Sequence, residues 1–164
     1  MDAITIRRAE ASDAARLNAA LRRLSDDIGD PHGATDEMLV RAGFGDYPVF
    51  HALLAEANGE TVGVALYSPV FSTVRASPGV YVSDLWVSDT VRGKGLGRKL
   101  LKAVATDAGH AWGAGFLKLA VYHDNDEAQA FYHRLGFTPV DDESIMSLDA
   151  DGFAALRNSQ EAKP

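Results

Sequence analysis

The chain has 164 residues, 46% of them hydrophobic, which is enough to bury one core and gives no reason to expect a second domain. It contains no cysteine, which excludes disulfides, thiolate metal sites and a cysteine nucleophile, and we expect no bound metal. The formal net charge of -7 argues against nucleic acid as a partner, because binding to the phosphate backbone depends on clustered Lys and Arg, but it is compatible with a cationic substrate.

Neither a leader nor a membrane span is expected. The first twenty residues hold no apolar leader segment. No uninterrupted apolar run approaches the roughly 18 residues that a membrane-spanning helix needs. We therefore expect a cytoplasmic protein that does not associate with membranes.

The N-terminal segment predicts a short strand followed by a helix. Residues 4–7 alternate between apolar and polar like a strand, and Ser12 and Asp13 are suited to cap the N-terminus of a helix. Residues 29–33, with two glycines and a proline, end this helix. Its apolar stripe consists of Leu17, Leu21, Leu24 and Ile28.

A second helix and a hairpin are expected next. The helix should begin at Thr35, with acidic residues in its first turn, and stop before Gly43. Residues 51–56 and 61–67 read as strands, and Asn58-Gly59 between them is a strong signal for a tight antiparallel hairpin.

The middle of the chain predicts a strand, a turn and a helix. Residues 68–79, which contain several Ser and Pro, are expected to form a loop, and the apolar residues 80–87 are expected to form a strand. A helix follows the glycine-rich segment that begins at Arg92. One face of this helix is apolar and is suited to pack on a sheet; its residues are Leu96, Leu100, Leu101, Val104 and Ala108.

The segment from Arg92 to Gly97 reads R-x-x-G-x-G and connects that strand to that helix. A glycine-rich turn at a helix start presents free backbone N–H groups and the positive end of the helix dipole to one point, which suits a phosphate. A dinucleotide-binding fingerprint would require glycine at Arg98, and a P-loop would require Ser or Thr at Gly95. Both are excluded, and the turn alone does not identify its ligand.

The C-terminal third is expected to complete the same domain. Residues 116–122 form a buried strand that should run parallel to the preceding one, since a helical crossover separates them. The next helix carries Phe131 and Tyr132 on its apolar side and is closed by Gly136. Two short closing strands are expected at 137–140 and 145–149. One domain then spans residues 1–156, and the polar tail 157–164 is expected to be disordered.

Two motifs in this order resemble the GNAT N-acetyltransferase superfamily. The R-x-x-G-x-G loop is followed, one helix and one strand later, by Asn125 and a helix that bears A-x-x-F-Y-x-x-x-G-F from Ala128 to Phe137. Two motifs at the right separation are more specific than either one alone, and the resemblance extends from Ile6 to Met146. It implies an α/β (α+β) fold whose central mixed, mostly antiparallel sheet is splayed between two parallel central strands and flanked by helices.

The resemblance implies acetyl-CoA as co-substrate and direct transfer of its acetyl group to a primary amine. The backbone of the strand before the loop is expected to pair with the pantetheine arm and, at Val87, with the acyl oxygen, while the loop amides hold the pyrophosphate. The residues expected to bind acetyl-CoA are Leu85, Trp86, Val87, Arg92, Gly93, Lys94, Gly95, Leu96, Gly97, Arg98, Asn125, Ala128 and Tyr132.

Within the superfamily, residues 43–48, 51–56 and 81–84 are similar to the diamine and polyamine (spermidine/spermine) N-acetyltransferase group. That group carries a glutamate, thought to handle the proton of the amine, where this chain has Ser83; the adjacent Asp84 is retained. The similarity implies a small cationic amine as substrate and a homodimer, for which the apolar Ile145 and Met146 are suited.

The chemistry requires a proton acceptor and a proton donor. A primary amine of pKa near 10 must lose a proton before it can attack, at a cost of roughly 4 to 5 kcal/mol at pH 7. The candidate acceptors are Asp84, His51, His123 and Glu56. Tyr132 matches the family position of the general acid that protonates the leaving thiolate.

The amine site and the type of acceptor stay open at this point. An acidic cluster fits either a cationic acceptor or an ordinary solvated surface, and the two explanations are equally good; it consists of Asp26, Asp27, Asp30, Asp36 and Glu37. The expected substrate contacts are Asp27, Ser83 and Asp84. Alternative functions are acetylation of a protein lysine, an N-terminus, an amino acid or a thialysine-like amine. A CoA-binding sensor without catalysis and an unrelated nucleotide-binding module are further alternatives.

Overall fold

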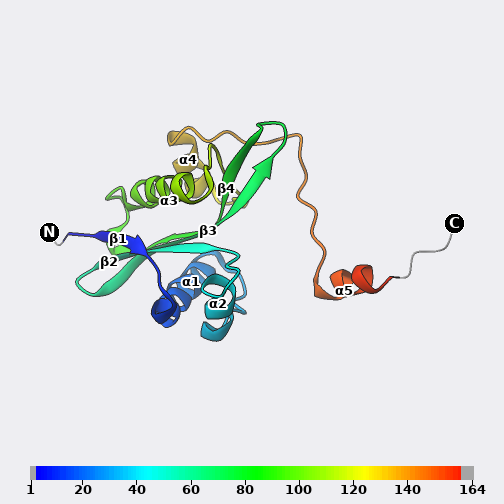
Figure 1. Cartoon of the computed structure of the whole chain (residues 1–164). Helices are drawn as coiled ribbons and strands as arrows, with labels where there is room; N and C mark the ends of the chain where they lie inside the picture. The colour runs from blue at the N-terminus through cyan, green and yellow to red at the C-terminus, as the bar shows by residue number, and fades with distance from the viewer. Residues whose placement is uncertain (1–2, 160–164) are drawn as a thin grey trace. The chain divides into compact units, whose positions relative to one another are not determined.

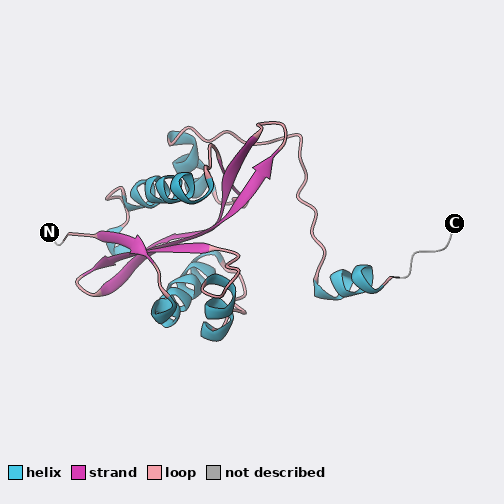
Figure 2. Ribbon diagram, viewed as in Figure 1, coloured by secondary structure: helices cyan, strands magenta, loops and turns pink. Residues whose placement is uncertain are grey.

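A five-stranded sheet organises residues 5–119 in the order β1-β2-β3-β4-β5. Figure 2 shows its strands in magenta. The structure, a computed structural model, describes residues 3–159, and these divide into two units between Asn125 and Asp126. Neighbouring strands are antiparallel except β4 and β5, which run parallel, as predicted from the helical crossover between them. The strands are β1 (Thr5–Arg8), β2 (His51–Ala57), β3 (Glu60–Ser72), β4 (Ser77–Val87) and β5 (Leu117–Leu119).

Helices cover both faces of this sheet (Figure 1). Helices α1 and α2 pack on one face, where Leu17, Leu54 and Val64 are completely buried. Helix α3 packs on the other face through Leu100 and Val104, which are also completely buried. The helices of this unit are α1 (Ala14–Ile28), α2 (Asp36–Gly43) and α3 (Leu96–Trp112), with short 3-10 helices η1 (Ala11–Asp13) and η2 (Asp89–Val91).

The local signals for the hairpin turn and for the helix boundaries at Gly29 and Thr35 are confirmed, whereas the expected cap at Ser12 and Asp13 makes no side-chain hydrogen bond to the start of α1. Asn58 (φ 52°) and Gly59 (φ 79°) both have positive φ, as a two-residue type I′ hairpin requires. Gly29 ends α1 in the left-handed conformation, and the Thr35 side chain accepts a hydrogen bond from the Met38 N–H at the start of α2.

The expected loop at 68–79 is wrong, because most of it belongs to β3 and β4. Val80 N–H donates to Phe116 O and Pro78 O accepts from Gly115 N–H, both at 2.9 Å, so Pro78 faces β5 rather than β3. Pro69 pairs with Val80, a position that makes no hydrogen bond across the β3–β4 ladder. Neither proline therefore removes a bond from this ladder, and the hairpin extends to a turn at residues 73–76.

The second unit contains two helices, α4 (Asp126–Arg134) and α5 (Ala150–Asn158). The closing strands expected at 137–140 and 145–149 are wrong: within the described chain these residues form no strand, and Ile145 and Met146 are 83% and 88% exposed. A strand needs a neighbour to satisfy its backbone, and none is provided there. Arg157 lies in α5 instead of a disordered tail, and residues 160–164 lie outside the described part.

No helix among residues 3–159 combines the length and the apolar character needed to cross a membrane.

An ion cluster joins β1 to η1 and β2. The Arg7 guanidinium donates two hydrogen bonds to Asp13, at 2.7 and 2.9 Å, and two to Glu56, at 2.9 and 3.1 Å. Arg16 adds a third cationic hydrogen bond to Glu56 at 2.8 Å. These bidentate bonds fix the first strand and the entry to α1 against the centre of the sheet.

The Asn variant of Asp13 is expected to lower the free energy of unfolding at pH 7 by about 2 kcal/mol. The hydrogen bonds from Arg7 lower the pKa of the buried Asp13 carboxyl from 3.8 to about 2. A lowered folded-state pKa stabilises the fold above about pH 4, and this contribution is lost as the pH falls through about 2. Urea titrations of wild type and Asp13→Asn at pH 7 and at low pH test this, with the exposed Asp46→Asn as control. An equal difference at both pH values would contradict it.

Candidate active site

A β-bulge at Ser83 shapes the wall of the candidate site. Strands β3 and β4 pair Leu66 with Asp84 and Tyr67 with Val82, so Ser83 is the extra residue on β4. Side chains alternate between faces along a regular strand, and two consecutive residues would then point to opposite faces of the sheet. Because of the bulge, Ser83 and Asp84 line the same cavity on the face that carries α1.

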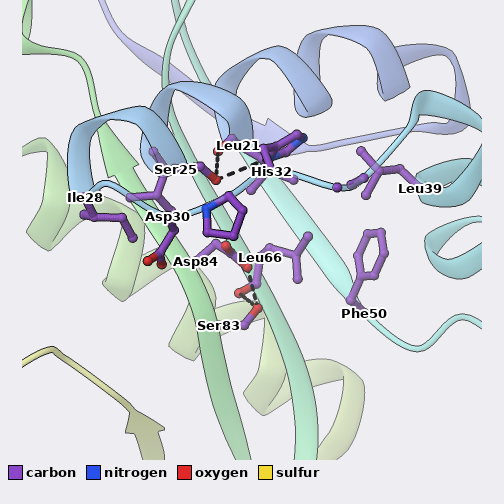
Figure 3. A pocket seen from close by; sticks show the side chains of 14 residues that line it. Leu21, Ser25, Ile28, Asp30, His32, Leu39, Phe50, Leu66, Ser83 and Asp84 are labelled. Atoms are coloured by element: carbon purple, nitrogen blue, oxygen red, sulfur yellow. Dashed lines mark hydrogen bonds between the residues drawn. The ribbon is translucent and has the colours of Figure 1, made fainter. Parts of the chain in front are cut away.

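The cavity has a volume of about 450 Å³ and lies between α1, the loop after it, α2 and strands β3 and β4 (Figure 3). Its apolar wall is formed mainly by Leu21, Leu24, Ile28, Leu39, Phe50 and Leu66. Its polar side chains are those of Ser25, Asp30, His32, Ser83 and Asp84. A mostly apolar cavity with a few convergent polar groups is the usual form of a small-molecule site.

The carboxylates of the cavity are Asp84 and Asp30. Burial raises the pKa of Asp84, although a hydrogen bond from Ser83 Oγ (2.7 Å) and the nearby His32 favour its ionised form. Asp30 accepts hydrogen bonds from the Tyr122 hydroxyl at 2.9 Å to each of its carboxylate oxygens. The lining residues include no Lys or Arg, so the cavity is suited to a cation.

His32 also lines the cavity, and the sequence did not single it out as a candidate. Its Nε2 lies 2.7 Å from Asn18 Oδ1, and its Nδ1 lies 3.3 Å from Ser25 Oγ. A single His in a loop of Gly and Pro shows no recognisable pattern. The available signal was Asn18, a polar residue on the buried stripe of α1 that is only 8% exposed and therefore needs a partner.

The loop that follows β4 has the geometry of an anion site. Gly93 and Gly95 both have φ of +77°, a conformation that side chains rarely adopt. The first hydrogen bond of α3 runs from Lys99 N–H to Gly95 O (3.1 Å), so the amides of Leu96, Gly97 and Arg98 precede the helical ladder. Leu96 is only 2% exposed and anchors the start of α3 in the core.

The end of β4 is an open sheet edge. The parallel pairing with β5 is confined to Val80–Val82, so within the described chain the rest of β4 has no partner strand on this side. Ser88 N–H donates to Val62 O on β3 at 2.9 Å. The backbone N–H and C=O groups of successive residues point alternately to the two sides of a strand, so those of Trp86 also point toward β3. The backbone groups of Leu85 and Val87 therefore point toward the open edge. Val87 O accepts a hydrogen bond from Arg92 Nε at 3.1 Å on that edge.

Asp27, expected to contact the substrate, and Arg92, expected to bind acetyl-CoA, form an ion pair with each other. Arg92 Nη2 lies 2.6 Å from Asp27 Oδ2, which also accepts the indole N–H of Trp86 at 3.0 Å. Asp27 does not line the cavity. Lys94 Nζ donates to Thr90 O at 3.4 Å, within the loop.

Asn125 is the last residue of the first unit, and its backbone N–H donates to Tyr122 O at 3.1 Å. Ala128 and Tyr132 lie on α4 in the second unit. The Tyr132 ring packs against Phe131 and Phe137, with centroids 5.2 and 5.4 Å away. Burial raises the pKa of Tyr132, so its hydroxyl remains protonated at pH 7.

The other candidate proton acceptors lie outside the cavity. His51 Nδ1 is 2.9 Å from Asp107 on α3, which also accepts from the Tyr67 hydroxyl at 2.7 Å. Glu56 is held by Arg7 and Arg16. His123 is exposed and is not among the lining residues. Among residues 3–159, no group of His, Cys, Asp and Glu has the arrangement of a metal site.

Comparison with known proteins gives concordant matches. The acetyltransferase (GNAT) family matches residues 18–137. The thialysine N-epsilon-acetyltransferase of Mus musculus is 35% identical, and the match covers 99% of this chain and 96% of that protein. An integron cassette protein from the mobile metagenome of V. cholerae has a similar structure, with a TM-score of 0.77 and 24% identity over 95% of this chain and 98% of its own. The structure of an aminoglycoside N-acetyltransferase in complex with CoA is also similar, with a TM-score of 0.73 and 18% identity. The match covers 92% of this chain and 97% of that one.

Proposed function

The chain belongs to the acetyltransferase (GNAT) family, and we propose that it transfers the acetyl group of acetyl-CoA directly to the primary amine of a small cationic substrate. The observation that carries this proposal is the cavity at the β4 bulge. Its two carboxylates, Asp84 and Asp30, lie in an apolar wall that has no Lys or Arg in its lining. An ammonium group is attracted there, whereas an anion is not.

The residues around the loop fit acetyl-CoA, which supplies an acetyl group activated as a thioester. The amides of Leu96, Gly97 and Arg98, with those of Gly93 and Gly95, are available to hold a pyrophosphate at the positive end of the α3 dipole. The backbone groups of Leu85 and the N–H of Val87 can pair with an extended pantetheine arm as an added strand does, while Val87 O is hydrogen-bonded to Arg92. Arg92 and Lys94 add positive charge at this loop. Asn125 and Ala128 are further residues that we propose to bind acetyl-CoA.

The reaction requires the substrate to lose a proton before it attacks. Asp84 attracts and orients the ammonium group, with the Ser83 hydroxyl holding the carboxylate at 2.7 Å. Tyr132 is assigned the role of proton donor to the departing thiolate, because its buried hydroxyl stays protonated at pH 7. Asp27 contributes indirectly, through its ion pair with Arg92.

Diamines and polyamines are the substrate class that the cavity favours. A lysine-like amino acid also has the reactive amine, but its carboxylate would need a cation, and the lining residues include no Lys or Arg. The second candidate is a thialysine-like amine, which is favoured by the name of the 35% identical relative. Diamines and thialysine-like amines share the reacting primary amine. They differ chiefly at the opposite end of the substrate, where only the thialysine-like amine has a carboxylate.

Release of CoA thiol from acetyl-CoA, measured across a panel of amines, tests the proposal. We expect turnover with a diamine and a polyamine. For thialysine and lysine we expect kcat/KM to be lower by a factor of about ten or more. Asp30→Asn, which removes a cavity carboxylate, should lower kcat/KM for diamines, with the exposed Glu37→Gln on α2 as matched control. Stabilisation by CoA without turnover on any amine would favour a sensor, and turnover only on peptides would favour protein acetylation.

A cytoplasmic location and a homodimer are part of the same proposal. The homodimer is supported by Ile145 and Met146, two apolar side chains that are 83% and 88% exposed on the segment before α5. Sedimentation of wild type and of a variant with Ser at both positions tests it, since only the wild type should dimerise.

A further inference from the structure

We propose that His32 is the general base that takes the proton of the substrate ammonium, with the Ser25 hydroxyl carrying it from the cavity to Nδ1. This inference rests on the proposed function and assigns a step that Asp84 and Ser83 leave open. Both His32 and Ser25 line the cavity, His32 from the loop after α1 and Ser25 from α1 itself (Figure 3). The imidazole is near enough to Asp84 for a charge on His32 to favour the ionised carboxylate.

The hydrogen bonds around His32 determine which nitrogen is free to accept a proton. Asn18 Nδ2 lies 2.7 Å from Asp36 Oδ1, and because an ionised carboxylate only accepts, the Asn18 amide group must face Asp36 with its NH2. Its Oδ1 therefore faces His32 Nε2 at 2.7 Å, and this nitrogen must carry a hydrogen. In the neutral imidazole the unprotonated, basic atom is Nδ1.

The surroundings of Nδ1 satisfy both protonation states. Ser25 Oγ lies 3.3 Å from Nδ1 and 3.2 Å from Leu21 O. When the imidazole is neutral, the hydroxyl can donate to Nδ1. When Nδ1 is protonated, it donates to Ser25 Oγ, and the hydroxyl turns to donate to Leu21 O. No polar group is left unsatisfied in either state, so the proton can move without the cost of an unpaired buried group.

The proton transfer is balanced within these groups. The ammonium N–H gives its proton to Ser25 Oγ while the Ser25 hydrogen moves to His32 Nδ1, which leaves a neutral amine with a free electron pair and an imidazolium. The amine nitrogen then forms the new bond to the acyl carbon, the carbon–sulfur bond breaks, and the second proton that the nitrogen loses balances the one that the departing thiolate takes up. The imidazolium returns its proton to solvent after product release.

His32 is better suited to this step than the carboxylates beside it. An imidazole has a reference pKa of about 6.5, close to the working pH, whereas a carboxylate near 4 is too weak a base to compete for the proton of an amine near 10. The acidic groups around His32 are Asp84 from β4, Asp30, which lines the same cavity, and Asp36, which is hydrogen-bonded to Asn18. All three stabilise the imidazolium once it forms.

The test is the pH dependence of kcat/KM for the best amine of the panel. As the pH falls, wild type should lose more activity than the falling fraction of free amine accounts for. His32→Gln should be about 100-fold slower at pH 7 and lack this acidic limb. Added imidazole should restore His32→Ala in proportion to its free base. The exposed His110→Gln is the matched control and should keep the wild-type profile.

Two results would overturn the inference: a His32→Gln profile that keeps the acidic limb, or an absence of imidazole rescue in a His32→Ala protein that CoA still stabilises. If His32 variants do not fold, Ser25→Ala serves instead, since Ala is compatible with α1, and it should slow the reaction at pH 7 with recovery at high pH. An unchanged Ser25→Ala profile would likewise overturn it. A wild type that is inactive on every amine would reject the proposed function and the role of His32 with it, whereas an active wild type with unaffected His32 variants would reject the role of His32 alone.

Discussion

Replacing Tyr132 by Phe is expected to lower kcat by about 10²- to 10⁴-fold, the range for loss of a positioned general acid. Burial keeps the hydroxyl protonated at pH 7, and without it the thiolate leaves with no proton donor. Phe retains the ring that packs between Phe131 and Phe137, so the melting temperature should stay nearly unchanged. Steady-state thiol release and thermal melts measure both quantities.

Two comparisons make this result specific to the hydroxyl of Tyr132. Tyr47→Phe removes the same group from a side chain that is 90% exposed, and it should leave kcat unchanged. Raising the pH above the pKa of the CoA thiol should narrow the gap between Tyr132→Phe and wild type, because the thiolate then leaves without needing a proton. A Tyr132→Phe enzyme with wild-type kcat would remove Tyr132 from the mechanism.

The elements with local signals were predictable from the sequence. The hairpin at Asn58-Gly59, the helix start at Thr35 and the parallel β4–β5 pair each depend on a few neighbouring residues or on one crossover, and the structure confirms them. The extension of β3 and β4 through Pro69 and Pro78 was not predictable in this way. Whether a proline is tolerated depends on which neighbour its nitrogen faces, and this is set by the register of strands far apart in the sequence.

The candidate site was predictable only in part, for a similar reason. The resemblance identified Ser83 and Asp84 as neighbours, but a residue pair on a strand predicts side chains on opposite faces. Only the bulge brings both into one cavity. His32 becomes a candidate through Asn18 and Ser25, which precede it by 14 and 7 residues and approach it because the loop folds back along α1.

Replacing Asp84 by Asn is expected to lower kcat/KM for a diamine by about 10²- to 10³-fold. Asp84 is the carboxylate that the bulge turns into the cavity, and removing its charge leaves the substrate ammonium without its partner in an apolar wall. The amide oxygen can still accept the hydrogen bond of Ser83, so the geometry of the wall should persist. Most of the loss should appear in KM, whereas loss of the base at His32 should appear in kcat.

The same substitution is expected to raise the melting temperature at pH 7. Burial raises the folded-state pKa of Asp84 above its unfolded value, so the ionised carboxylate opposes folding at neutral pH. The wild type regains this stability as the pH falls through the folded pKa, and it is fully present below about pH 4. The advantage of Asp84→Asn over wild type should therefore be largest at pH 7 and shrink toward pH 4, while Glu37→Gln shows no such trend.

A variant that is both less active and less stable at pH 7 would show that Asp84 supports the fold. A gain in stability with a loss of activity is the expected signature of a carboxylate kept in an apolar cavity for its charge.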